Sequence, residues 1–132
     1  MKALDTNVLV RFLVKDDEHQ ADIVYKLFKK AETDKDTFYV PLLVVLETIW
    51  VLESVYKISR MDTLDSINAL VLMPILDFEA QSTILSFISS ARNVKTELSD
   101  LLIAYSAKSS GCEYVLTFDK RATDYILFKL LK

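Results

Sequence analysis

Short hydrophobic runs alternate along the chain with longer stretches in which apolar residues recur at helical spacing. The short runs predict strands at Lys2–Leu4, Phe38–Val40, Pro74–Leu76 and Tyr114–Phe118. Helical stretches lie between these runs, and strands that alternate with helices are typical of a parallel sheet covered on both faces. The pattern therefore predicts an α/β fold.

The helical stretches begin and end at residues that favour helix termini. The acids at Asp16–Glu18 and the proline at Pro41 are each typical of the start of a helix. Ser59 begins a capping box, which also marks a helix start, and Gly111 is typical of the residue after a helix end. The expected helices are a short one near Phe12–Val14 and then about 17–32, 42–56, 59–71, 79–91 and 100–110. The apolar tail Tyr125–Leu131 is ambiguous, and whether it forms a last strand stays open.

Helical spacing also indicates which side chains face the core. The inward positions of the helices near 17–32 and 79–91 are Val24, Leu27, Phe28 and Ala31, and Ala80, Ile84, Phe87, Ile88 and Ala91. The helix from Leu42 is apolar on nearly every face, so we predict that it is largely buried. Cys112 is expected to be a small core residue.

Composition narrows the class of protein. The 132 residues suit a single domain, 1–132. Cys112 is the only cysteine and His19 the only histidine, which excludes an internal disulfide and a zinc site built from these residue types. Asp5 argues against a signal peptide, and no apolar run approaches the ~20 residues of a membrane-spanning helix. We therefore expect a soluble, cytoplasmic protein with no membrane partner.

Two acids directly follow predicted strands. Asp5 comes after the first strand and Asp119 after the strand Tyr114–Phe118. Ligands of parallel sheets bind beyond the carboxyl ends of the strands, so these two positions are candidates for one site. The alternative for each is an ordinary turn residue.

Two further acids lie at unusual places in predicted helices. Glu47 stands in an apolar helix, where a lone buried carboxylate would be costly, unless it lies on an exposed stripe. Glu53 is a weaker candidate almost two turns further on. Asp100 begins a helix, where an acid also interacts favourably with the helix dipole.

Convergence of these four carboxylates would require that their mutual repulsion be relieved. At ~5 Å and an effective dielectric of about 20, each like-charged pair repels by roughly 3 kcal/mol, against a typical domain stability of about 5–15 kcal/mol. Protonation or cations would relieve this repulsion. Oxygen ligands without His or Cys suit Mg²⁺ or Mn²⁺, and two such ions support phosphodiester hydrolysis.

Four segments in order resemble the successive acidic motifs of PIN domains: Leu4–Asn7, Glu47 in its apolar helix, Leu98–Ala104 and Leu116–Lys120. They cover nearly the whole chain, and its short form is similar to the toxin of VapBC-type toxin–antitoxin systems. The resemblance implies a three-layer α/β/α sandwich with a central parallel sheet of about four to five strands. It also implies a Mg²⁺- or Mn²⁺-dependent endoribonuclease that cleaves tRNA or rRNA, and a cognate antitoxin.

The same resemblance implies roles for individual residues. Catalytic metal-site acids would be Asp5, Glu47, Asp100 and Asp119, and the side chains that orient them Thr6, Asn7 and Thr117. Glu97 is either an acid just outside the metal site or a solvent-facing residue. The chain departs from the family pattern at Ala122–Tyr125, which lacks the expected glycine-containing loop.

The net charge of −3 at first argues against nucleic acid as a partner. Basic residues that flank the acids in sequence would form a rim that holds the RNA backbone: Arg11, Arg92, Lys95, Lys120 and Arg121. The alternative is that they are ordinary solubilising charges. The apolar excess of the chain also favours a surface for the antitoxin or for a second copy in a homodimer.

Two other functions share features with this sequence. A haloacid-dehalogenase-type phosphatase also has an Asp after its first strand, but needs a second Asp where this chain has Asn7. A PIN-like scaffold that has lost catalysis and only binds is the main alternative, and retention of all four acids argues against it.

Overall fold

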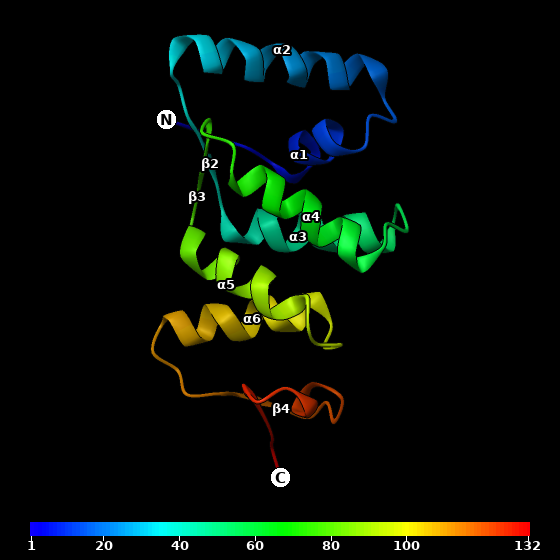
Figure 1. Cartoon of the computed structure of the whole chain (residues 1–132), viewed down its shortest axis with the longest axis vertical. Coiled ribbons are helices and arrows are strands. Elements are labelled where there is room, and N and C mark those ends of the chain that lie inside the picture. The colour runs from blue at the N-terminus through cyan, green and yellow to red at the C-terminus, as the bar shows by residue number, and fades with distance from the viewer. The chain divides into compact units, whose positions relative to one another are not determined.

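The computed structural model describes all residues, 1–132, and divides the chain into two compact units. Unit 1 is Met1–Gln81 and unit 2 is Ser82–Lys132. Figure 1 shows the elements of both units, which are described one at a time below. None of the helices is long and apolar enough to span a membrane.

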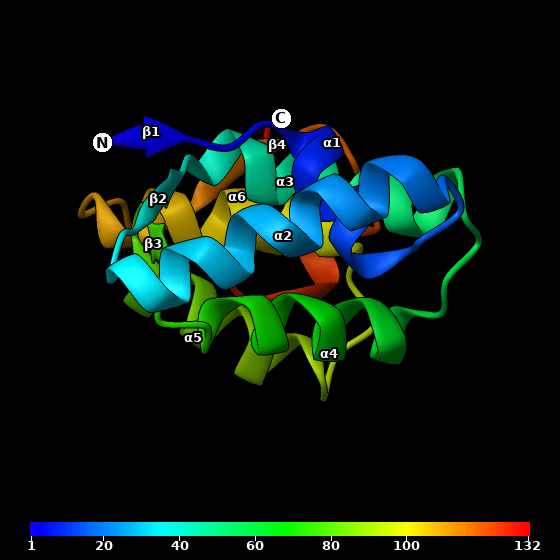
Figure 2. The same ribbon diagram turned by 90° about the horizontal axis from the view of Figure 1, so that it is seen from above.

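Unit 1 contains a parallel three-stranded sheet. Its strands are β1 (Lys2–Ala3), β2 (Phe38–Val40) and β3 (Leu76–Phe78), in the order β1-β2-β3. Seen from above, the three strands lie together at one side of the unit, and α1, α2 and α4 extend away from them (Figure 2). The N–H of Leu4 donates to the Tyr39 carbonyl at 2.9 Å, so the β1 pairing continues to the residue before Asp5.

Four helices complete unit 1: α1 (Thr6–Leu13), α2 (Glu18–Asp34), α3 (Leu42–Ser54) and α4 (Arg60–Val71). Side chains cap three of them, as Asp5 accepts from the N–H of Thr6, Asp17 from Gln20 and Ser59 from Asp62. Helix α1 packs against both α2 and α3, and α3 packs against α4.

Helix α3 is held at its start by a residue from another element. Pro41 precedes α3 and makes no side-chain cap. The carboxylate of Glu79, just after β3, accepts from the N–H of Leu42 at 2.9 Å, while the N–H of Glu79 donates to the Val40 carbonyl at 3.0 Å. The carboxyl end of the sheet is therefore tied to the start of the helix that carries Glu47.

Unit 2 combines two helices with a pair of parallel strands. Helix α5 (Gln81–Ala91) begins at the unit boundary, and α6 (Leu98–Ser109), β4 (Val115–Thr117), a short 3₁₀ turn (Ala122–Asp124) and β5 (Phe128–Leu130) follow. Strands β4 and β5 pair in parallel, with Val115 opposite Phe128. Ala104, Ala122 and Phe128 form a small buried cluster that joins α6, the turn and β5.

The predicted α/β class with parallel strands is confirmed, and the ambiguous tail forms strand β5. The five strands are divided into a sheet of three and a sheet of two. Gly111 follows α6 with φ 93°, the left-handed conformation expected after a helix end.

Several element boundaries differ from the prediction. Helix α1 begins at Thr6, well before Phe12, because Asp5 already caps its first turn. Strand β3 begins at Leu76, since the N–H of Leu76 donates to the Met73 carbonyl and closes a turn through Pro74. Helix α6 begins at Leu98, so Asp100 lies in its first turn and is not its cap.

Some burial predictions were wrong. Cys112 is exposed, as are Leu27 in α2 and Ala80, which has a left-handed backbone (φ 57°) before α5. Helix α3 is also not buried on all sides, because Leu43 and Trp50 are 77% and 55% exposed. The remaining inward positions of α2 and α5 are buried as predicted.

Replacing Thr63 with Val should stabilise the protein by about 1 kcal/mol, because a buried hydroxyl without a partner typically costs about 1–3 kcal/mol. Thr63 in α4 is fully buried, and its Oγ1 has no hydrogen-bond partner. Urea unfolding would measure the change in the free energy of unfolding.

Thr48→Val is the matched control, since Thr48 is equally buried but its Oγ1 donates to the Val44 carbonyl at 2.7 Å. Thr48→Val should therefore give no comparable gain. A lower unfolding midpoint for Thr63→Val would contradict the prediction and mean that its hydroxyl is paired.

Candidate active site

Asp5 lies where β1 ends and α1 begins. Its Oδ1 accepts a hydrogen bond of 2.7 Å from the N–H of Thr6, which fixes the carboxylate at the helix start. The residue is exposed, so the carboxylate is accessible to solvent. The sequence pattern placed Asp5 after a strand, and the structure adds that it caps a helix.

Glu47 lies on the exposed side of α3, as the stripe alternative allowed. The hydroxyl of Thr6 donates to its Oε1, while the N–H of Thr6 donates to Asp5. Thr6 itself is only 4% exposed, so packing holds it in place. One buried threonine thus connects the two candidate acids of unit 1. Asn7, the other expected neighbour, is exposed on α1.

Asp100 lies in the first turn of α6 in unit 2. Burial raises the pKa of its carboxyl, and the negative charges of Glu97 and Asp119 raise that pKa further. Glu97 and Asp119 therefore each lie close enough to Asp100 to repel its negative charge. Glu97 precedes α6 and makes no side-chain cap, so its charge is not used to start the helix.

Asp119 follows β4 in a turn supported by its neighbours. Its N–H donates to the Thr117 hydroxyl at 3.0 Å, and its Oδ1 accepts from the N–H of Arg121 at 2.9 Å. Thr117 therefore supports the backbone of Asp119, in agreement with its expected place beside the acid.

A cavity of about 430 Å³ in unit 2 joins these groups. It is lined by Val94, Lys95, Thr96, Glu97, Asp100, Asp119, Arg121, Ala122, Asp124 and Tyr125. Thr96, Asp124 and Tyr125 were not among the site residues predicted from the sequence. The only signal for the last two was the atypical segment 122–125, which was read as a departure from the family pattern.

The structure thus brings the candidate acids together in two groups, Asp5 with Glu47 in unit 1 and Asp100 with Asp119 and Glu97 in unit 2. Within neither unit are three or more Asp, Glu, His or Cys side chains arranged to hold a metal ion. Convergence of all four acids therefore stays a prediction. The donor chemistry fits Mg²⁺ or Mn²⁺, since the donors are oxygens and a cation would relieve the repulsion around Asp100.

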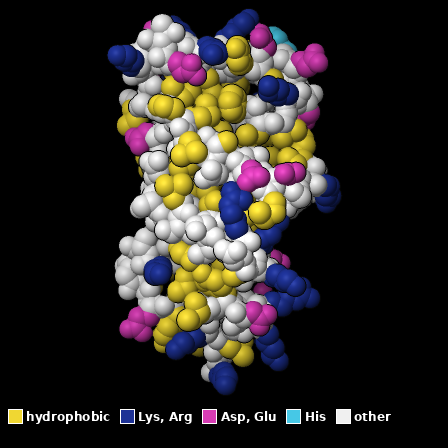
Figure 3. Space-filling view, in the orientation of Figure 1, with side chains coloured by type: hydrophobic (Ala, Val, Ile, Leu, Met, Phe, Trp, Pro, Cys, Tyr) yellow, Lys and Arg dark blue, Asp and Glu magenta, His cyan; other side chains and the backbone are white.

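The predicted basic residues have different surroundings. Lys95 and Arg121 line the cavity of unit 2, and Lys120 is exposed beside Arg121. Arg92 is exposed directly after α5. In the face shown in Figure 3, Lys and Arg side chains gather along the lower right edge of unit 2, with an acidic side chain among them.

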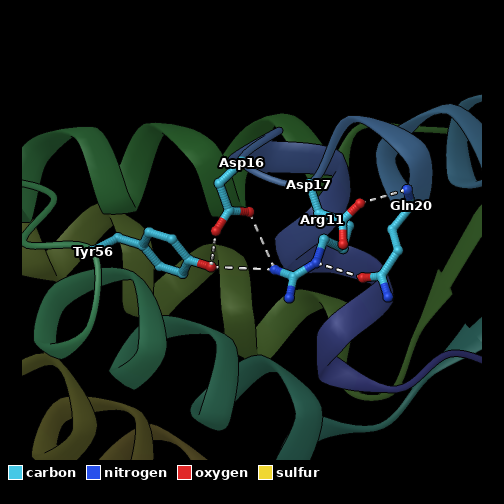
Figure 4. A network of polar contacts seen from close by, with 5 residues as sticks. All are labelled: Arg11, Asp16, Asp17, Gln20 and Tyr56. Carbon is cyan, nitrogen blue, oxygen red and sulfur yellow. Dashed lines mark hydrogen bonds and ion pairs between the residues drawn. The ribbon is translucent and has the colours of Figure 1, made fainter.

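Arg11 belongs to a separate polar network in unit 1 (Figure 4). Its Nε donates to Gln20 at 2.7 Å, and its Nη1 donates to the Tyr56 hydroxyl at 3.2 Å and pairs with Asp16 at 3.3 Å. The Tyr56 hydroxyl also donates to Asp16 at 2.8 Å. Arg11 therefore links α1 and α2 to the segment after α3.

Replacing Asp100 with Asn should stabilise the metal-free protein at neutral pH. A raised pKa means that the ionised carboxyl is less favourable in the folded than in the unfolded chain, and Asn removes this cost. The gain should shrink as the pH falls and vanish below the ordinary pKa of 3.8, where Asp100 is protonated in both states. Thermal melts in EDTA across this pH range would test it.

Glu113→Gln, at an exposed position before β4, is the control for removing one negative charge from unit 2. It should not reproduce the pH-dependent gain. An Asp100→Asn protein that melts well below wild type at neutral pH would instead make Asp100 a structural residue of the helix start.

Known proteins match this chain over the segments that carry these acids. The family model described as PIN domain matches residues 2–126. A curated VapC ribonuclease from Aquifex aeolicus (strain VF5) is 26% identical over 121 residues, which cover 92% of this chain and 89% of that protein. Since the family match includes all four candidate acids and nearly the whole chain, the protein belongs to the PIN domain family.

Proposed function

We propose that this protein is an endoribonuclease that depends on Mg²⁺ or Mn²⁺ and is the toxin of a type II toxin–antitoxin pair. The observation that carries the proposal is the cavity of unit 2, where Asp100 and Asp119 lie with Lys95 and Arg121. Carboxylates suit the metal and cations suit the phosphates of a nucleic acid. Similarity to a VapC ribonuclease supports RNA as the substrate.

The metal-site acids of this proposal are Asp5 and Glu47 in unit 1 and Asp100 and Asp119 in unit 2. Asp5 and Glu47 are oriented by Thr6, and Asp119 by its turn. When bound, the divalent ions would lower the pKa of a water and stabilise the leaving oxygen of the phosphodiester. A single domain, 1–132, is a further part of this proposal.

The basic side chains of the cavity would hold the RNA backbone. Lys95 and Arg121 are exposed and line the same space as the acids, so a phosphate near the metal site lies within their reach. Two further exposed basic residues belong to this proposed group. Lys120 directly precedes Arg121 in the chain, and Arg92 lies three residues before Lys95. The proposed RNA-binding group does not include Arg11, because its guanidinium already contacts Gln20, Tyr56 and Asp16 in unit 1.

Control by an antitoxin follows from the same chemistry. A carboxylate cluster that binds cations also accepts an Arg or Lys side chain, so an antitoxin can block the site with a basic residue. A tRNA or rRNA target, a homodimer and a cytoplasmic location are further parts of this proposal.

Asp5→Asn and Asp100→Asn should each abolish RNA cleavage without unfolding the protein. Asn keeps the oxygen that caps α1 but removes the charge needed by the metal. The loss should be on the order of 100-fold or more, because losing a supporting contact to a metal ligand already costs about 10–100-fold. Cleavage of RNA during a Mg²⁺ titration would measure it.

Asp77→Asn serves as the control, since Asp77 is an exposed acid in β3 that belongs to neither group of candidate acids. It should keep wild-type cleavage. Wild-type protein that binds RNA but cleaves none at any Mg²⁺ or Mn²⁺ concentration would support the inactive-scaffold alternative.

A Lys95→Ala/Arg121→Ala double variant should bind single-stranded RNA with a shallower salt dependence. Each phosphate contact contributes a slope of about −0.7 in log affinity against log salt, so two lost contacts should change the slope by roughly 1.4. RNA affinity measured at several salt concentrations would give this slope.

Lys26→Ala/Lys29→Ala is the matched double variant. These lysines are exposed on α2 and pair with Asp22 at 2.9 Å and Glu32 at 3.7 Å. Their removal should leave the slope unchanged. The opposite result, with only the α2 pair changing the slope, would move the RNA-binding surface to α2.

A further inference from the structure

Tyr125 forms part of the cavity wall in unit 2, together with Asp100 and Asp119. It lies between the 3₁₀ turn and β5, and its N–H donates to the Ala122 carbonyl at 3.1 Å. The side chain is partly exposed. The hydrolysis proposed above gives this aromatic ring no role.

The hydroxyl of Tyr125 is engaged on the protein side. It hydrogen-bonds with the Tyr105 hydroxyl at 2.6 Å, and the Tyr105 hydroxyl hydrogen-bonds with Ser90. The two rings also pack, with centroids 6.4 Å apart and planes inclined by 47°. Residues of α5 and α6 therefore fix the orientation of the Tyr125 ring before any ligand arrives.

The surroundings of Tyr125 favour the neutral form of its phenol. Burial raises the pKa of Tyr125, and its hydrogen bond to Tyr105 raises that pKa further. A neutral phenol carries no charge that would repel phosphates. Tyr125 therefore adds an uncharged aromatic side chain to the cavity wall.

The rest of the cavity matches the parts of a nucleotide. Lys95 and Arg121 provide cations suited to phosphates, and the carboxylates of Asp100 and Asp119 line the same space. The volume of about 430 Å³ lies within the roughly 300–1,000 Å³ of typical ligand sites. An aromatic ring fixed in such a wall suits a base.

We propose that the ring of Tyr125 stacks against an unpaired nucleobase next to the scissile phosphate and so acts as a specificity-determining residue. The inference rests on the proposed ribonuclease function and adds a substrate requirement. A base within a duplex is already stacked on its neighbours, so only a single-stranded or looped segment can present one to the ring. Selection among bases would be weak, since every base has a face that stacks.

Fluorescence quenching of 2-aminopurine tests the contact directly. Short single-stranded RNAs carrying one 2-aminopurine at successive positions would be bound to the full chain in EDTA, where metal-dependent cleavage does not proceed. Wild type and Tyr125→Phe should quench the probe at one position, and Tyr125→Leu should not. Loss of the ring should weaken RNA binding roughly 5- to 150-fold, as expected for one base–aromatic stack.

Tyr114→Leu is the matched control, because Tyr114 is 40% exposed in the same unit, lies outside the cavity lining, and has its ring covered by the Lys129 ammonium at 4.3 Å. Tyr114→Leu should keep both the quenching and the RNA affinity. A loss equal to that of Tyr125→Leu would overturn the assignment to Tyr125.

An abasic site at the quenched position gives a second test that does not depend on the Leu variant folding. It should weaken binding to wild type and Tyr125→Phe by a similar factor, and should add little to Tyr125→Leu. Wild-type protein that binds and cleaves RNA but quenches no position, or binds abasic RNA equally well, would overturn the inference alone. Failure to bind or cleave RNA would overturn the proposed function and this inference with it.

Discussion

Repulsion between neighbouring carboxylates is the constraint around which the candidate site is built. The structure supports these groups with neutral donors: the N–H and hydroxyl of Thr6 for Asp5 and Glu47, and a backbone N–H for Asp119. Ion pairs are used elsewhere, between Arg11 and Asp16 and along α2. Neutral donors orient a carboxylate while leaving its charge in place, which is what a site for an exchangeable cation needs.

Local backbone structure decides where each acid lies. Asp5 both follows β1 and caps α1, and Asp100 lies in the first turn of α6. A helix N-terminus carries a partial positive charge of about +0.5, which lowers the cost of holding an acid there. That compensation is incomplete at Asp100, since burial and its acidic neighbours still raise the pKa of its carboxyl.

The sequence predicted the features that depend on short-range signals. The strand ends at Asp5 and Asp119, the cap at Ser59 and the glycine after α6 were all placed from neighbouring residues. The position of β3 was missed by two residues, because an apolar run does not distinguish a buried turn from a strand. The alternation of apolar and polar residues at Leu76, Asp77 and Phe78 matches the alternating burial of the actual strand.

The features that were missed depend on contacts between distant residues. Glu79 caps α3 across the end of the sheet, and no pattern near Pro41 indicates this partner. The exposure of Cys112 likewise depends on packing that the adjoining strand and glycine do not reveal. Tyr125 lines the cavity, and its hydroxyl meets that of Tyr105 on α6, twenty residues earlier in the chain, a contact that no local pattern indicates. The cavity of unit 2 thus contains two kinds of groups. The positions of its charged residues follow from the local sequence, whereas the orientation of the neutral Tyr125 ring depends on contacts in the folded unit. Because that ring adds no charge, the proposed stacking would provide affinity for RNA without neutralising the carboxylates of the proposed metal site.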